Sequence, residues 1–157
     1  MMAEAPTVRH QVVVPGTPEL AFETFTQRLG EFKPPEHNLL GSPIASTILE
    51  PRIGGHIVDT GEDGSECRWA RVLAFEPPDR LVFSWDIGPT WQLEDAEHSS
   101  EVELRFIADG PDHTRVELEH RHLDRHGPGW PAVHEGVDSD QGWPLYLARY
   151  AALLEAS

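Results

Sequence analysis

The 157-residue sequence is strongly acidic, with a formal net charge of -15 at pH 7 and an isoelectric point of about 4.8. A field of this sign repels phosphate backbones and anionic lipid, so nucleic acid and membrane surfaces are excluded as expected partners. The length and the apolar fraction of 39% suit one domain over residues 1–157 with a substantial core.

The single cysteine, Cys67, excludes an internal disulfide and indicates a reducing compartment. Cys67 could act as a nucleophile, but its place inside a strand pattern favours a small buried side chain. The N-terminus has no basic and apolar signal pattern, and no apolar run approaches ~18 residues. We therefore expect a cytoplasmic protein.

The first elements are predicted to be a strand and a helix. Residues 7–14 alternate, with Val8, His10, Val12 and Val14 on one face. A helix should then begin near Thr17, which can cap it, with Pro18 in the first helical position. Its apolar stripe is Phe22, Phe25 and Leu29, and Gly30 is expected to end it. Residues 32–40 contain two prolines and should be irregular, with one helical turn after the prolines.

Six further strands are expected between residues 44 and 122, separated by short turns rich in glycine, proline and aspartate. They cover residues 44–50, 56–60, 67–75, 81–87, 101–108 and 114–122. The last two should form a hairpin whose outer face is a solvated surface of mixed charge and includes Glu103. Val102, Leu104, Phe106, Val116, Leu118 and His120 should face inward.

The C-terminal part is expected to be helical. A short helix is predicted around residues 131–137, followed by a helix near residues 143–155 with an apolar stripe on one face. Strands joined by short turns imply one antiparallel sheet, which the last helix would cover. Because a twisted sheet and a straight helix do not mate along their whole length, the space between them is the expected ligand cavity.

This order of elements, together with several short motifs, resembles the SRPBCC superfamily of START and birch-pollen-allergen proteins. Within it the sequence is similar to the branch named after the activator of the heat-shock-protein-90 ATPase. The resemblance implies an α+β helix-grip fold, a curved antiparallel sheet of about six or seven strands wrapped on a long C-terminal helix. The motifs are VPGTPELAF at 14–22, EPRIGG at 50–55, RVLAFEPPDRL at 71–81, SW at 84–85, TRVELEH at 114–120 and GW at 142–143.

Rings that the fold turns inward are the candidate cavity walls. The candidate ligand-binding residues are Phe25, His37, Trp69, Phe83, Trp85, His120, Trp143 and Leu147. His120 is either a polar anchor for the ligand or a hydrogen-bonded core histidine. His37 follows two prolines and is either an acid or base at the cavity mouth or an ordinary loop histidine.

The sequence shows no serine-hydrolase elbow, zinc-protease motif or phosphate loop, so no catalytic residue is assigned. His120, His122 and His126 have a spacing that resembles metal ligands, but no Cys or Asp completes a ligand set, and neither a metal nor a cofactor is expected.

The primary hypothesis is a monomeric or homodimeric protein that binds a small apolar or aromatic molecule. An enzyme of cyclase or hydrolase type that uses the same cavity is the second hypothesis, and a chaperone ATPase cofactor with a chaperone partner is the third.

Overall fold

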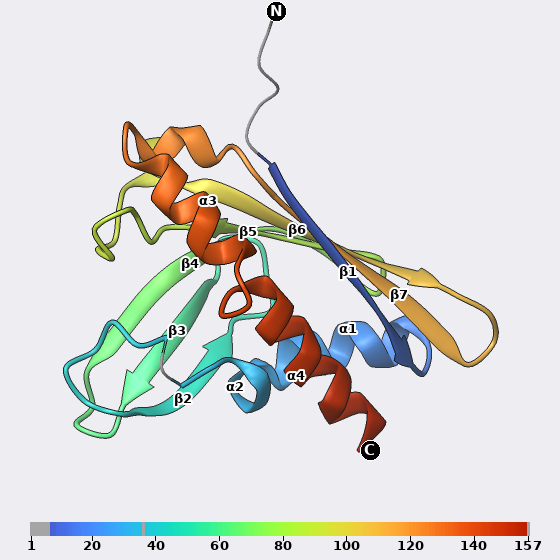
Figure 1. The fold of residues 1–157 in the computed structure, drawn as a ribbon. Coiled ribbons are helices and arrows are strands. Elements are labelled where there is room, and N and C mark those ends of the chain that lie inside the picture. The colour runs from blue at the N-terminus through green and yellow to red at the C-terminus, as the bar shows by residue number, and fades with distance from the viewer. Residues whose placement is uncertain (1–6, 36, 157) are drawn as a thin grey trace, which may run out of the picture.

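The computed structural model describes residues 7–35 and 37–156. Its strands form a seven-stranded antiparallel sheet in the order β1-β7-β6-β5-β4-β3-β2 (Figure 1). The strands are β1 (Thr7–Pro15), β2 (Ile44–Leu49), β3 (His56–Gly61), β4 (Glu66–Glu76), β5 (Arg80–Trp85), β6 (Ser100–Ala108) and β7 (His113–Arg121). The curved antiparallel sheet predicted from the sequence is confirmed.

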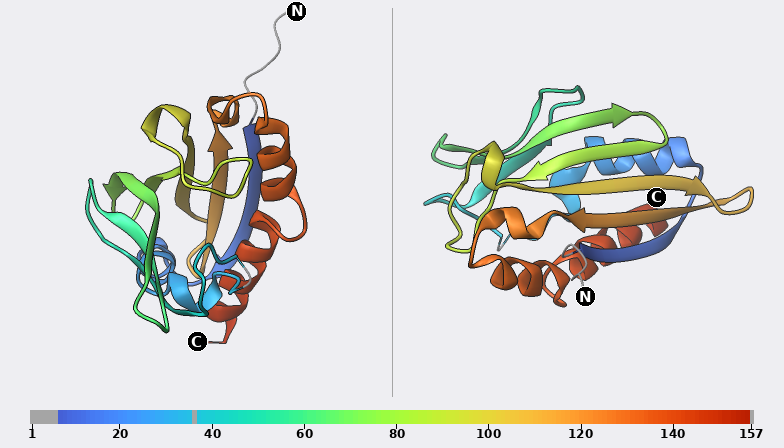
Figure 2. Two further views of the ribbon diagram at one scale, coloured as in Figure 1. Left: turned by 90° about the vertical axis from the view of Figure 1, so that its left-hand side faces the viewer. Right: turned by 90° about the horizontal axis from the view of Figure 1, so that it is seen from above.

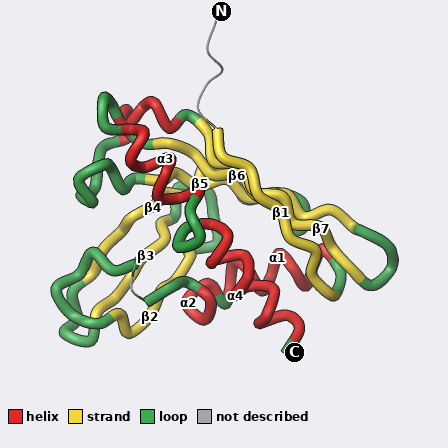
Figure 3. Tube along the Cα trace, viewed as in Figure 1, coloured by secondary structure: helices red, strands yellow, loops and turns green. Residues whose placement is uncertain are grey.

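The sheet bends so that its two ends enclose the helices on its concave side (Figures 1 and 2). The helices are α1 (Pro18–Gln27), α2 (Leu29–Phe32), α3 (Trp130–Asp138) and α4 (Trp143–Glu155), with 3-10 turns η1 (Ala96–His98) and η2 (Leu123–His126). Figure 3 shows α1, α2 and α4, in red, between the β2–β3 end of the sheet and the β1–β7 end. Among the described residues, no helix combines the length and hydrophobicity needed to cross a membrane.

The start of α1 follows the sequence prediction, but its end does not. Thr17 caps the helix, since its hydroxyl oxygen accepts a hydrogen bond of 3.2 Å from the backbone N–H of Leu20. The helix ends at Gln27, and Gly30 lies inside the short helix α2 rather than at a terminus. A Cβ at Gly30 would lie 3.1 Å from the carbonyl oxygen of Thr47, so close packing against β2 accounts for this glycine. The helix α2 precedes the prolines, and a hydrogen bond of 3.1 Å from the His37 backbone N–H to the Pro34 carbonyl oxygen closes one turn at the prolines, although residue 36 of that predicted turn lies outside the described residues.

Aromatic side chains on the concave side form two groups. The phenylalanine cluster lies where α1, α2 and α4 meet the sheet, and its rings are Phe22, Phe25, Phe32, Phe75, Phe106 and Tyr150. The tryptophan cluster lies nearer the junction of α3 and α4, and its rings are Trp69, Phe83, Trp85, His120, Trp143 and Tyr146. Edge-to-face contacts within both groups hold the inward faces of sheet and helices together.

The helical cover is interrupted between α3 and α4. Gly142 bridges the break with a φ of -95° and a ψ of -133°. A Cβ at this position would lie 2.2 Å from the carbonyl oxygen of Val137, so the break requires glycine. The two helices match the two predicted around 131–137 and 143–155.

One residue of the outer sheet face departs from the predicted solvated surface. Glu103 is only 3% exposed, because Arg80, Arg105 and Arg121 lie over its carboxylate. Burial opposes ionisation of Glu103, but the hydrogen bonds from Arg80 and Arg121 hold its pKa below the ordinary value. Strand alternation predicts the direction of this side chain correctly and its burial wrongly.

Candidate ligand-binding site

A pocket of about 470 Å³ lies between the sheet and the break in the helical cover. This volume falls within the range of roughly 300–1,000 Å³ typical of small-molecule sites. Its walls come from β3, β4 and β5, from the segment after α2, from the loop after β5, and from both sides of the α3–α4 break. The lining residues are Lys33, His37, Asn38, Leu39, Asp59, Trp69, Trp85, Ile87, Trp91, Gly136, Val137, Ser139, Gln141, Gly142, Trp143 and Tyr146.

The structure brings half of the predicted site residues to this pocket. His37, Trp69, Trp85 and Trp143 line it. The other four are buried outside the lining: Phe25 in the phenylalanine cluster, Phe83 and His120 behind the indoles, and Leu147 on α4.

Two of the pocket indoles have buried N–H groups without an acceptor. Trp69 and Trp85 are 2% and 6% exposed, and neither Nε1 atom has a hydrogen-bond partner among the described residues. Leaving a buried donor unsatisfied costs about 1–3 kcal/mol. The two rings contact each other edge to face, with centroids 5.5 Å apart.

A buried ion pair forms part of the wall. The Lys33 ammonium lies 3.2 Å from a carboxylate oxygen of Asp59, and both side chains are about 95% buried, with exposures of 5% and 3%. Lys33 also donates to the carbonyl oxygen of His37 at 2.6 Å and lies 5.7 Å from the centre of the Trp69 ring. Asp59 accepts a hydrogen bond of 2.7 Å from Thr47. The pair therefore places two ionic groups in a wall that also carries the Trp69 ring.

A second polar pair and an exposed ring complete the site. His37 Nδ1 lies 3.1 Å from the Tyr146 hydroxyl oxygen, joining the segment after α2 to α4. Trp91 is 63% exposed, and its φ of 59° is unusual for a bulky residue. Such backbone strain is concentrated at functional sites in proteins. Because Trp91 both lines the pocket and is exposed, its ring forms part of the pocket rim.

Behind Trp143 runs a continuous chain of hydrogen bonds. Trp143 Nε1 donates to His120 Nδ1 at 3.0 Å, and His120 Nε2 lies 2.7 Å from Ser100 Oγ. Ser100 Oγ lies 2.8 Å from His126 Nε2, and His126 Nδ1 lies 2.9 Å from Glu94 Oε1. The chain thus links the pocket wall to a carboxylate whose side chain is 25% exposed.

The proton positions along this chain follow from one another. Because His120 Nδ1 accepts from the indole, a neutral His120 carries its proton on Nε2 and donates to Ser100. The Ser100 hydroxyl then donates to His126 Nε2, and the remaining His126 proton, on Nδ1, goes to Glu94. Complete burial lowers the pKa of His120 to about 3, which keeps this imidazole neutral.

Glu94, His126 and Ser100 have the connectivity of a serine-hydrolase triad, since acid, imidazole and hydroxyl bond in the same order. Ser100 is completely buried and does not line the pocket, so its hydroxyl has no access to a substrate there. The chain instead satisfies and orients Trp143, one wall of the pocket. Sequence patterns place His120 inward correctly but give no sign of these partners, which come from separate loops and strands.

His122 takes no part in this arrangement and occupies a left-handed backbone position with a φ of 61°. Among the residues that the structure describes, no group of three His, Cys, Asp or Glu side chains could hold a metal ion.

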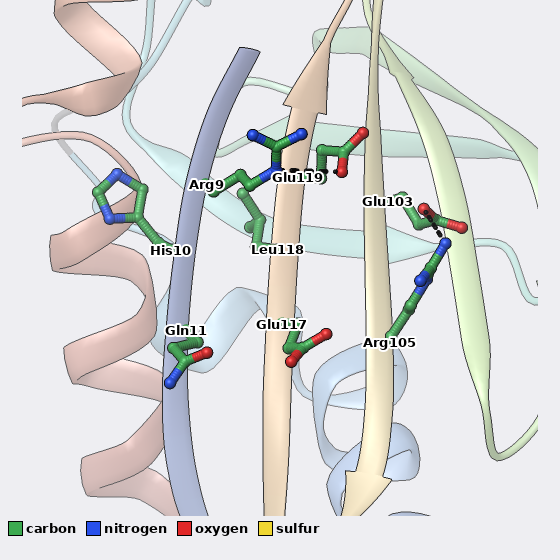
Figure 4. Close-up of a pocket in the computed structure, with 8 residues that line it drawn as sticks. All are labelled: Arg9, His10, Gln11, Glu103, Arg105, Glu117, Leu118 and Glu119. Atoms are coloured by element: carbon green, nitrogen blue, oxygen red, sulfur yellow. Dashed lines mark hydrogen bonds and ion pairs between the residues drawn. The ribbon is translucent and has the colours of Figure 1, made fainter.

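A second hollow, of about 490 Å³, lies along β1, β7 and β6 (Figure 4). Its lining is mostly charged, and the charges are paired, as in Arg9 with Glu119 at 3.5 Å and Arg105 with Glu103 at 3.2 Å. Sites for small molecules are lined mainly by apolar and aromatic side chains with few polar groups, and this hollow is not. The ring-lined pocket is therefore the better candidate site.

The curved sheet with helices on its concave side is a helix-grip fold. The sequence model described as "Activator of Hsp90 ATPase homolog 1-like protein" matches residues 15–155, and the chain belongs to this family. The resemblance noted from the sequence motifs is thereby confirmed.

Two solved structures share substantial sequence identity with the chain. Txn09, described as an anthrahydroquino-γ-pyrone synthase, is 39% identical over 97% of this chain and 99% of its own, with a TM-score of 0.67. CalC of Micromonospora echinospora, described as a self-sacrificing resistance protein, is 30% identical over 97% of this chain and 96% of its own, with a TM-score of 0.67.

Protein MLL2253 of Mesorhizobium loti, at 20% identity over 96% of this chain and 98% of its own, with a TM-score of 0.64, shows the fold alone. A comparison with curated proteins finds no match.

Proposed function

We propose that this protein binds a small, largely aromatic molecule in the pocket at the α3–α4 break. The observation that carries the proposal is the lining itself, in which four indoles and the apolar side chains of Leu39, Ile87 and Val137 border a space of about 470 Å³. Aromatic rings give large contact areas and favourable edge-to-face or stacked geometry toward a planar ligand. The 39% identity with Txn09, whose description names a fused-ring product, supports an aromatic ligand.

An enzyme that works in the same pocket is the second candidate. Its support is the presence of the Lys33–Asp59 and His37–Tyr146 pairs in the wall, together with the synthase description of Txn09. Groups that exchange protons beside a bound aromatic molecule are what a ring closure or aldol-type step requires. Binding and catalysis share the site, so the first experiment separates them by turnover.

The family description also leaves a chaperone ATPase cofactor as a third candidate. The ring-lined pocket gives no reason to prefer this role over binding of a small molecule. Addition of the protein to a chaperone ATPase assay tests it, and an unchanged ATPase rate is expected.

The test of the primary proposal is a titration of intrinsic tryptophan fluorescence with fused-ring aromatic compounds at pH 7. Saturable quenching with one site per chain is expected, because four indoles line the pocket. Mass spectrometry of the recovered compounds distinguishes a binder, which returns them unchanged, from an enzyme, which does not. The proposal fails if no compound in the panel gives a saturable signal.

A further inference from the structure

The three buried indoles of the pocket differ in one respect. The N–H of Trp143 is satisfied inside the protein by His120 at 3.0 Å. The N–H groups of Trp69 and Trp85 are equally buried and have no acceptor among the described residues. An edge-to-face ring contact supplies at most a weak N–H···π interaction, so these two donors retain most of their hydrogen-bonding capacity.

We propose that Trp69 and Trp85 form a hydrogen-bonding subsite for the carbonyl oxygen of a fused-ring aromatic ketone, quinone or pyrone. This inference rests on the proposed function and names the ligand class for that site. Both indoles belong to the pocket lining, and their ring centroids lie only 5.5 Å apart, so one edge of a ligand can lie beside both rings. A carbonyl oxygen has two lone pairs and can accept from both.

A carbonyl group fits this subsite better than a charged acceptor does. A carboxylate would lose its hydration in the pocket, and the Lys33 ammonium that could attract it is already paired with Asp59 at 3.2 Å. A hydrocarbon would offer neither N–H group an acceptor. Because both nitrogens lie beneath the surface of the lining, a small turn of either indole accompanies entry of the ligand.

The test compares 9-fluorenone with fluorene, which have the same three-ring frame and differ in the carbonyl group. Dissociation constants are measured by calorimetry for the wild-type protein and for Trp69→Phe and Trp85→Phe, which remove the N–H and keep an aromatic ring. The ratio of the two ligands' affinities cancels the difference in their hydration. Loss of one hydrogen bond should reduce this ratio about fivefold in each variant.

Trp91→Phe is the matched control, since Trp91 also lines the pocket but is 63% exposed, so water already satisfies its N–H. Its affinity ratio should stay within twofold of the wild-type value. In the unaltered protein, fluorenone should move the indole N–H proton resonances of Trp69 and Trp85 further downfield than fluorene does, since both ligands exert similar ring-current shifts and only fluorenone accepts a hydrogen bond. The Trp143 N–H resonance should be the same with the two ligands. This second measurement does not depend on how well the variants fold.

Equal loss of affinity for both ligands in the Trp69 and Trp85 variants, or the same Trp69 and Trp85 N–H shifts with fluorenone as with fluorene, would overturn the carbonyl subsite and leave the binding function intact. Failure of the wild-type protein to bind either compound would contradict both the subsite and the proposed function.

Discussion

Replacement of Ser100 by alanine should destabilise the protein far more than the loss of one hydroxyl ordinarily does. Ser100 Oγ lies 2.7 Å from His120 Nε2 and 2.8 Å from His126 Nε2, and Ser100 is completely buried. Without this oxygen, the His120 N–H loses its acceptor and His126 Nε2 loses its donor. Each unsatisfied buried group costs about 1–3 kcal/mol, so the free energy of unfolding should fall by at least about 2 kcal/mol.

Ser99→Ala is the matched control, because Ser99 is the neighbouring residue and is 2% exposed. Its hydroxyl donates to the carbonyl oxygen of Asp95, which also accepts from the backbone N–H of His98 at 3.1 Å. Since that carbonyl keeps a partner, Ser99→Ala should cost only about 0.5–1.5 kcal/mol.

Urea unfolding followed by tryptophan fluorescence measures the free energy of unfolding of both variants. The comparison holds if the slope of that free energy against urea concentration is the same as for the wild type. The indole N–H resonance of Trp143 should also move in Ser100→Ala, because its acceptor His120 loses its own fixed orientation. Equal losses in the two serine variants, with an unmoved Trp143 resonance, would refute the proposed chain of hydrogen bonds.

Three further predictions concern charge, pH and the helix break. Lys33→Met should lower the free energy of unfolding by about 3–5 kcal/mol, because it leaves the buried Asp59 carboxylate without its cation; removal of both charges should recover part of the loss in urea melts. The pKa of His120 is about 3 in the folded protein and near 6.5 when unfolded. The contribution of the neutral imidazole to the free energy of unfolding is therefore complete above pH 6.5 and declines as pH falls toward 3. The slope of unfolding free energy between pH 6.5 and 4.5 should therefore be shallower in His120→Leu, and an unchanged slope would contradict the assignment. Gly142→Ala should lower the melting temperature, because its Cβ would collide with the Val137 carbonyl oxygen 2.2 Å away; a melt at the wild-type temperature would contradict this.

Most of the fold was predictable because its signals are local. The alternation of Val8 to Val14, the cap at Thr17 and the proline at the first helical position depend on neighbouring residues, and β1 and the start of α1 formed where these patterns placed them. The errors came from contacts between distant segments. Gly30 was assigned to a helix end, but the backbone of β2 accounts for it, and Glu103 was assigned to solvent, but three arginines cover it.

The candidate site was predictable only in part, for the same reason. The strand and helix periodicity indicates that Trp69, Trp85 and Trp143 face inward and could line a pocket. It cannot distinguish them from Phe25, which also faces inward but lies in the phenylalanine cluster. That distinction depends on where the helical cover breaks. The Lys33–Asp59 pair carries no sequence signal, because a lysine beside a proline and an aspartate in a strand are ordinary until the fold joins them.

The most direct test of a ligand pocket at the α3–α4 break is to fill it. Gly136 lies inside α3 and lines the pocket, and a Cβ there would meet only Trp91, at 3.7 Å. Gly136→Ala and Gly136→Leu should both gain about 1 kcal/mol of helix propensity, so neither should melt below the wild type. Only the leucine side chain extends into the space that a ligand needs.

The decisive measurement is the dissociation constant of 9-fluorenone for these two variants, determined by calorimetry alongside their melting temperatures. If the pocket at the break is the binding site, Gly136→Ala binds like the wild type and Gly136→Leu binds at least tenfold more weakly while remaining fully folded. Equal affinity of the two folded variants would contradict the placement of the ligand in this pocket.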